Sequence, residues 1–230
     1  MKRSLLALLL AALLLAGCTG NAAQAQTEAP TAEPAEEPLP PETTDEPLPA
    51  ETAEEQLPLD PELPIGELSK ADATYYVNQK LAIGRTLNDE WFVIPGEDPR
   101  ESAADGHIQF IDMAAQRRDL SAGLNVLIDD VSMNGEVMET PEEYRDLSIP
   151  DLVQMAEGSG MKDVHAEANV FSLAGQEYPG IRFTCTMPHE DYYCQQIVIG
   201  CGKYIVTVTL STYDTDGLEE LAKMFYPLEP

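Results

Sequence analysis

Four cysteines and three histidines are the residues of this sequence most often used as metal ligands or nucleophiles. Cys185, His189, Cys194 and Cys201 lie within one short stretch of the chain. Zinc sites built from such residues usually include a Cys-x-x-Cys pair, which this stretch lacks. Strand alternation would also scatter the four side chains over two faces of a sheet. We therefore expect no metal site.

Cys185 and Cys194 fall on neighbouring strands of a predicted hairpin, so the strand register decides whether they can pair. A four-residue loop over 188–191 would place them directly opposite each other. A loop one residue longer aligns the apolar positions that include Phe183 with those that include Ile197. Because apolar matching selects the register, we predict the longer loop. Cys185 is then a buried thiol on the face opposite Cys194, without a disulfide between them, and Cys201 is an exposed thiol in a turn.

The remaining candidates for chemistry have structural explanations. His107 and His165 each lie in a predicted strand without a fixed partner, and packing or exposure is the simpler role. Ser159 lies in a Gly-Ser-Gly helix end and not in a Gly-x-Ser-x-Gly nucleophile elbow. The acidic residues at 129–130 and 214–216 match no calcium-binding loop. We assign no catalytic residue and no cofactor, and we expect Trp91, the single tryptophan, to anchor the core at a strand start.

The N-terminus has the pattern of an export signal. Lys2 and Arg3 precede a run of leucine and alanine over 5–15, which is too short to cross a membrane as a helix. The following Leu-Ala-Gly-Cys18 resembles the lipobox of bacterial lipoproteins, in which the cysteine is diacylated after cleavage. We predict a lipoprotein signal peptide over 1–17 and a lipid anchor on Cys18. An ordinary secretory signal with a chance cysteine is the alternative.

Residues 18–65 are predicted to be the lipidated cysteine followed by a disordered tether. The segment 19–64 holds ten of the 18 prolines, twelve acidic residues and no Lys, Arg, His or aromatic residue. Such a composition cannot bury enough apolar surface to offset the entropy of ordering. Its density of proline and like charge favours an extended chain that holds a domain away from the membrane. A proline-rich ligand for a partner is the alternative role.

Residues 66–230 are predicted to form a single domain. Thr140 and Pro141 open a helix that kinks or restarts at Pro150. A last helix opens at Asp216 with Glu219 as its capping-box partner and carries an apolar stripe that extends to Phe225. We expect strands over 75–77, 81–87, 90–94, 107–113, 124–131, 165–173, 180–187, 193–200 and 204–210. These elements describe an α+β fold: a mainly antiparallel β-sheet with a central kinked helix and a C-terminal helix packed on it.

The order of these elements resembles the Mog/PsbP-like α/β/α sandwich family, which includes DcrB-like extracytoplasmic lipoproteins. The segments that carry the resemblance are NDEWFVIP at 88–95, TPEEY at 140–144, LAGQE at 173–177, YYCQQ at 192–196 and GKYIVTVT at 202–209. The resemblance implies a fold and an accessory or binding role, and it brings no catalytic residues.

The net charge of −28 argues against a nucleic-acid partner, because no basic surface is available to neutralise phosphates. We expect a lipid-anchored binding or accessory protein on the extracytoplasmic face of the bacterial cell membrane, with no catalysis. Its expected partners are the membrane, through Cys18, and an unidentified protein or glycan. The alternatives are an envelope hydrolase or redox enzyme that uses Cys201 or a histidine, and a purely structural spacer with a folded cap.

Overall fold

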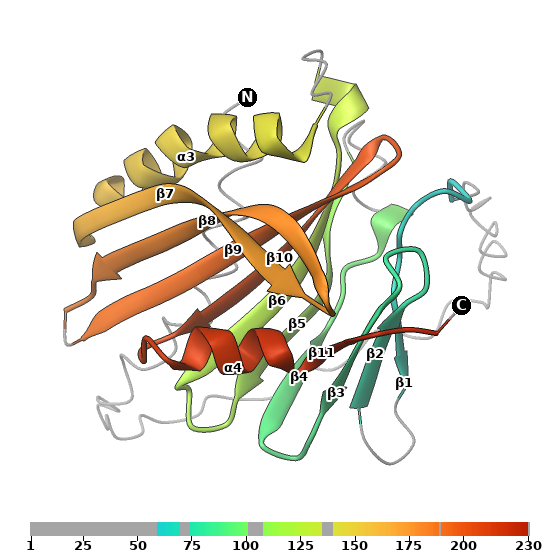
Figure 1. The fold of residues 1–230 in the computed structure, drawn as a ribbon, viewed down its shortest axis with the longest axis horizontal. Helices are drawn as coiled ribbons and strands as arrows, with labels where there is room; N and C mark the ends of the chain where they lie inside the picture. Colours follow the sequence, from blue (N-terminus) through green and yellow to red (C-terminus); the bar gives the residue numbers. More distant parts are fainter. Residues whose placement is uncertain (1–58, 70–73, 101–107, 135–139, 189, 230) are drawn as a thin grey trace, which may run out of the picture.

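The computed structural model describes residues 59–69, 74–100, 108–134, 140–188 and 190–229, and Figure 1 shows its fold. Cys18, His107 and His189 lie outside these residues, as do the predicted signal peptide and most of the predicted tether. None of the helices in the described ranges is long and apolar enough to span a bilayer.

Antiparallel strands form two sheets. The larger sheet has the order β4 (Trp91–Pro95), β5 (Gln109–Arg117), β6 (Ala122–Asp130), β10 (Tyr204–Thr212), β9 (Asp191–Cys201), β8 (Gln176–Thr186) and β7 (Lys162–Leu173). The smaller sheet has the order β1 (Glu67–Ser69), β2 (Thr74–Asn78), β3 (Ile83–Leu87) and β11 (Phe225–Pro227). The helices are α3 (Pro141–Gly158), α4 (Gly217–Lys223) and the short 3-10 helix η2 (Val131–Asn134). The predicted α+β class with a mainly antiparallel sheet is confirmed.

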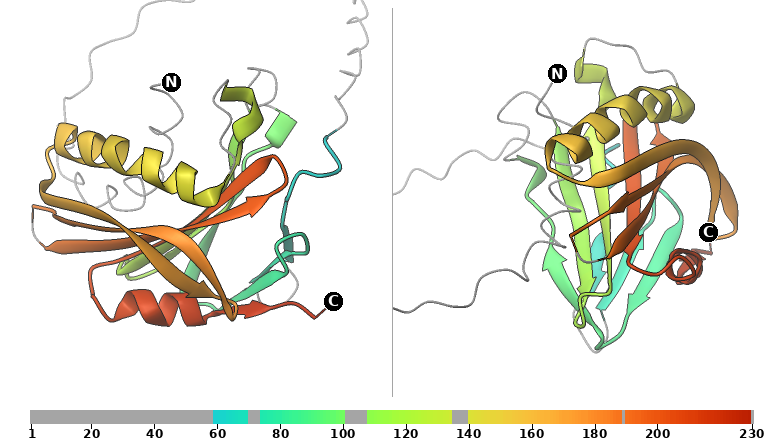
Figure 2. Two further views of the ribbon diagram at one scale, coloured as in Figure 1. Left: turned by 45° about the horizontal axis from the view of Figure 1, so that its top comes forward. Right: turned by 90° about the vertical axis from the view of Figure 1, so that its left-hand side faces the viewer.

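The two faces of the larger sheet are covered differently, as the left view of Figure 2 shows. On the helix face, α3 packs over β7, β8 and β9, where Leu152 and Ala156 contact apolar side chains such as Phe183. On the opposite face, which we call the core face, the smaller sheet and α4 cover the main core. Ile83 and Leu221 pack there against the apolar positions of β5, β6, β9 and β10.

The first helix begins where the sequence predicts. The Thr140 hydroxyl accepts a hydrogen bond from the Glu143 backbone N–H at 3.2 Å, and Pro141 occupies the first turn. The helix then runs to Gly158 as one element with Pro150 in its interior, so the predicted restart does not occur. Tyr144 and Leu152 on its buried side hold both halves against the sheet.

The C-terminal helix is shorter than predicted. It begins after Asp216 as expected, but the Asp216 side chain makes no capping hydrogen bond, and the helix ends at Lys223. Phe225, predicted to lie on its apolar stripe, instead begins β11, which pairs with β3. Pairing with the smaller sheet therefore competes with helix propagation at this point.

The predicted register of the β8–β9 hairpin is wrong. Cys185 pairs with Tyr192 and Phe183 pairs with Cys194, so both cysteines lie on the helix face. β9 begins at Asp191, two residues earlier than predicted, which makes the loop shorter, and the changed register turns the apolar positions of β8 towards α3. Apolar matching between strands favours the longer loop, but in the structure α3 supplies the apolar partner for β8. Cys185 is buried as predicted.

The chain is already packed at Leu59, ahead of residue 66, where the domain was predicted to start. Leu63 is buried. The Asp60 carboxylate accepts a hydrogen bond from the Tyr204 hydroxyl at 2.8 Å and forms an ion pair with the Lys203 ammonium at 3.0 Å. Lys203 also pairs at 2.9 Å with the buried carboxylate of Asp130. Residues 59–66 thus form a strap that fastens the end of the predicted tether to the fold.

The other end of the strap is held by a buried carboxyl group. Asp112 accepts hydrogen bonds from the Tyr76 hydroxyl at 2.6 Å and from the Gly66 backbone N–H at 2.9 Å. A side chain at Gly66 would collide with the Tyr76 ring, so glycine is required for this close approach. Burial raises the pKa of Asp112 to about 6, because two hydrogen bonds compensate desolvation only in part.

This burial gives a testable pH dependence. The unfolded chain releases the Asp112 proton near the ordinary pKa of 3.8, whereas the folded chain keeps it until about pH 6. The group's contribution to folding is therefore most favourable below about pH 4 and is lost as the pH rises through about 6. Asp112→Asn keeps an acceptor oxygen without the charge. We expect the stability of this variant relative to wild type to rise by up to about 3 kcal/mol between about pH 4 and pH 7.

Urea unfolding at both pH values measures this difference, and comparison with the wild type cancels the titration of the many other acidic groups. A stability difference that stays constant with pH would contradict the assignment of a raised pKa to Asp112.

Candidate functional site

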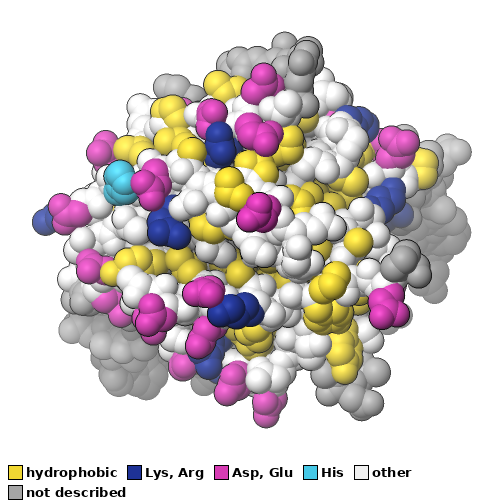
Figure 3. All heavy atoms as spheres, in the orientation of Figure 1, with side chains coloured by type: hydrophobic (Ala, Val, Ile, Leu, Met, Phe, Trp, Pro, Cys, Tyr) yellow, Lys and Arg dark blue, Asp and Glu magenta, His cyan; other side chains and the backbone are white. Residues whose placement is uncertain are grey.

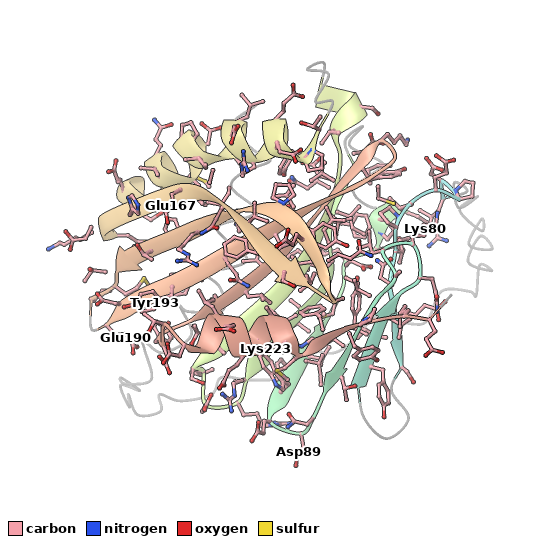
Figure 4. The ribbon with its side chains drawn as sticks, viewed as in Figure 1. Lys80, Asp89, Glu167, Glu190, Tyr193 and Lys223 are labelled. Carbon is pink, nitrogen blue, oxygen red and sulfur yellow. The ribbon has the colours of Figure 1, made fainter. Side chains whose placement is uncertain are left out.

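A groove of about 830 Å³ lies between α4 and the core face of β7, β8 and β9. It occupies the part of this face that the smaller sheet does not cover. The surface view in Figure 3 looks at this side of the molecule, where acidic and basic side chains are interspersed with hydrophobic ones. Figure 4 labels one residue from each of two elements that line the groove, Tyr193 on β9 and Lys223 on α4.

Two adjacent strands supply a block of four polar side chains to the groove floor. In the β8–β9 register, Arg182 lies opposite Gln195 and Thr184 lies opposite Tyr193. Side chains at directly opposed positions of an antiparallel pair have their β-carbons about 5 Å apart. The block therefore presents a guanidinium, an amide and two hydroxyls within the span of a single small ligand.

The central side chain of this block, Gln195, has no hydrogen-bond partner among the described residues. The residue as a whole is only 5% exposed, but its amide atoms are not among the fully buried unpaired atoms of the described chain, so the amide keeps access to the groove. An amide that is accessible only from a groove is suited to a hydrogen-bonding ligand.

Arg182 is exposed and also lacks a hydrogen-bond or ion-pair partner among the described residues. Its guanidinium lies 5.9 Å from the centre of the Phe171 ring, and within the described chain no carboxylate comes within ion-pair distance of it. Glu167 on β7 is opposite Arg182 in the register, but its carboxylate pairs with His165 at 3.6 Å. The five N–H donors of Arg182 are thus available to a ligand.

An apolar contact surface completes the groove. Phe171, Leu218, Ala222 and Phe225 line it, beside a surface ion pair between Glu219 and Lys223 at 2.8 Å. The Phe171 ring lies directly over Gly180 of β8, where an added β-carbon would come within 2.7 Å of the ring. Glycine at position 180 therefore allows the Phe171 ring, which is largely buried, to approach the β8 backbone closely.

The position of α4, the outer wall, depends on a buried arginine of the smaller sheet. Arg85 on β3 is fully buried and donates hydrogen bonds to the Leu221 carbonyl oxygen at 3.0 Å and to the Met224 sulfur at 3.2 Å. Its guanidinium lies between the rings of Trp91 and Phe225, at 5.0 and 4.9 Å from their centres. Burial lowers the pKa of Arg85 to about 9, so the group remains charged at neutral pH.

A positive charge at the last turn of α4 interacts favourably with the helix dipole, and the two rings add cation–π attraction. These contacts replace water around a charge that has no carboxylate partner among the described residues. Trp91 is confirmed as the core anchor predicted at the start of a strand.

The sequence-based candidates lie elsewhere. Asp129 accepts hydrogen bonds from Gln109 and Tyr144, and Asp130 pairs with Lys203, so both have structural roles. His165 is on the exposed strand β7 and not among the groove-lining residues. Within the described ranges, no three His, Cys, Asp or Glu side chains lie close enough together to hold a metal ion.

The cysteines are poorly suited to nucleophilic chemistry. Burial raises the pKa of Cys185 to about 11 and that of Cys194 to about 12, because the thiolate is disfavoured without water. Cys201, predicted to be exposed, is half-buried against the main core, and burial raises its pKa as well. None of the three lines the groove.

The groove residues themselves were not identified from the sequence. Polar residues alternate with apolar ones at 181–185, which indicates that one face of β8 is not packed in a core. That signal did not identify Arg182 or Thr184 as groove residues, because the incorrect register assigned the apolar face of β8 to the wrong layer.

No protein-family model matches the sequence, and neither does any curated protein. Among solved structures, a Pseudomonas aeruginosa protein of unknown function matches with a TM-score of 0.29 and 12% identity, over 66% of this chain and 85% of that one. LpqN of Mycobacterium tuberculosis, described as involved in cell envelope biogenesis, matches with a TM-score of 0.30 and 12% identity, over 71% and 91%. These similarities are too weak to assign a family or a function, so the Mog/PsbP-like resemblance stays a prediction.

The role of Arg85 is testable by substitution. Arg85→Ala removes the hydrogen bonds at the end of α4 and leaves a cavity between two rings, so we expect a loss of about 2–4 kcal/mol in the free energy of unfolding. Arg117→Ala is the matched control, since its ion pair with Glu90 is exposed and contributes less than about 1 kcal/mol. Equal losses in the two variants, measured by urea unfolding, would contradict the assignment.

Thiol accessibility offers a second test. In the folded protein we expect Cys201 to react first with a thiol reagent, and Cys185 and Cys194 to react only on unfolding, because both are 3% exposed. After unfolding without reductant, all three thiols should be counted. A loss of two thiols from that count would show that Cys185 and Cys194, which share a face, are joined by a disulfide.

Proposed function

We propose that this protein is a lipid-anchored, non-catalytic binding module of the bacterial cell envelope, and that the groove between α4 and β7–β9 is its ligand site. The observation that carries the proposal is the Gln195 amide, which belongs to a residue only 5% exposed, lines the groove floor and has no hydrogen-bond partner within the described chain. A ligand in the groove would supply that partner.

The anchor and the tether support the location. The lipobox-like sequence ending at Cys18 would supply two acyl chains, which suffice for stable membrane attachment. The acidic, proline-rich segment that follows would extend away from the anionic lipid surface and carry the domain with it. The strap at 59–66 fastens that segment to the fold, so the domain would be presented at a defined point of the chain.

The composition of the groove supports binding over catalysis. The residues described along its walls include neither cysteine nor histidine, and the acidic residue present, Glu219, is paired with Lys223 at the surface. An envelope hydrolase or redox enzyme that uses Cys201 would need an accessible thiol of low pKa, whereas burial raises the pKa of this thiol.

Site-specific photo-crosslinking in intact cells tests the proposal. A photoreactive amino acid at Thr215, an exposed residue of the groove rim, should crosslink to a ligand or partner of the envelope. The same amino acid at Leu147, which is 54% exposed on α3, is the control and should not give that product. Absence of a product specific to Thr215 would count against the groove as a binding site.

A further inference from the structure

We propose that the groove binds a neutral saccharide, a ligand rich in hydroxyl groups that is recognised by the side chains of Arg182, Gln195, Thr184 and Tyr193. This inference rests on the groove being the binding site, as proposed above. The four residues form two directly opposed pairs on β8 and β9, and none makes a side-chain hydrogen bond to another described residue.

The mixture of donors and acceptors selects the chemistry. The Gln195 amide both donates and accepts, as do the hydroxyls of Thr184 and Tyr193, whereas Arg182 only donates. A phosphate or carboxylate only accepts, so it would leave the Gln195 carbonyl oxygen unpaired. Sugar hydroxyl groups donate and accept at once, so neighbouring hydroxyls on one ring can satisfy all four side chains.

The position of the block in the sheet argues against an extended peptide. Peptides that bind to sheets usually add a strand at a free edge and use its backbone hydrogen bonds. Both β8 and β9 are interior strands, each paired on both sides, so their backbone groups are already used. Recognition at this floor therefore depends on side chains.

The apolar part of the groove fits the same ligand. Phe171 lies over Gly180 with the Arg182 guanidinium 5.9 Å from its ring centre, and α4 contributes the partly buried Leu218 and Ala222. A sugar ring has an apolar C–H face as well as a polar rim, and it can place the first against the apolar side chains of α4 and the second against amides and hydroxyls. Few other classes of ligand combine an apolar face and a polar rim in a molecule small enough for this groove.

The charge of the protein disfavours a polyanionic ligand. Residues 65–230 carry 11 basic and 29 acidic residues, a net charge of −18. The groove lining adds Arg182 and Lys223 against Glu219, which gives no strongly positive site. Polyanionic ligands such as nucleic acids would be repelled over most of the surface.

The experiment uses the purified full-length chain in a detergent without a sugar headgroup. The probes are neutral oligosaccharides of glucose, galactose, mannose and N-acetylglucosamine, and binding is detected by saturation-transfer NMR and quantified by titration. We expect at least one of these saccharides to bind. Gln195→Met should weaken that binding about fivefold to tenfold, which corresponds to the loss of one neutral hydrogen-bonding group.

Gln196→Met is the matched control. Gln196 is the next residue on β9 and is equally buried at 5% exposure, but it lies on the helix face. Its substitution should change the affinity by less than about twofold while having a similar chance of disturbing the fold. Tyr193→Phe, which removes only a half-buried hydroxyl, provides a second variant with little risk of misfolding.

A panel in which no saccharide binds would overturn the assignment, as would equal losses in the Gln195 and Gln196 variants. If the Thr215 photo-crosslinker instead captures a protein, the groove remains a binding site and only the saccharide is ruled out. If neither crosslinking nor saccharide binding is seen, the proposed function fails as well.

Discussion

The arrangement of this protein depends on one buried guanidinium group. Arg85 connects the smaller sheet to the end of α4 by hydrogen bonds to Leu221 and Met224, and it separates the rings of Trp91 and Phe225. The two hydrogen bonds join residues more than 130 positions apart in the chain. They fix the end of α4, which forms one wall of the groove. Leu221 is the buried residue of this helix, and Leu218 and Ala222 pack against the main core beside it.

Much of the fold could be predicted because its signals are local. Alternation identified β10, whose residues Tyr204, Val206 and Val208 face the main core, and the Thr140–Pro141 pair located the start of α3. The predictions are wrong where contact with an element distant in the sequence decides the strand register or the end of a helix. The β8–β9 register follows the packing of α3 on Cys185 and Phe183, and α4 ends early because Phe225 pairs with β3. Neither competing contact leaves a signal in the nearby sequence.

The candidate site was not predictable for a related reason. Its polar block exists only because the register opposes Arg182 to Gln195 and Thr184 to Tyr193, and a register shifted by one residue would turn two of these side chains to the other face. Glycines at 66, 84 and 180 let the rings of Tyr76, Tyr226 and Phe171 lie against the backbone of neighbouring strands. These glycines resemble ordinary turn or linker residues in the sequence, and only the sheet pairing shows what they accommodate.

The central claim is that unpaired polar groups on the groove floor are kept for a ligand. A crystal structure of the full-length protein grown with the tightest-binding neutral saccharide is the most direct measurement of this claim. The account predicts sugar oxygens within hydrogen-bond distance of both the Gln195 amide and the Arg182 guanidinium, with one ring face towards Leu218 and Ala222 of α4. An empty groove in which the Gln195 amide is hydrogen-bonded to another part of the protein would contradict it.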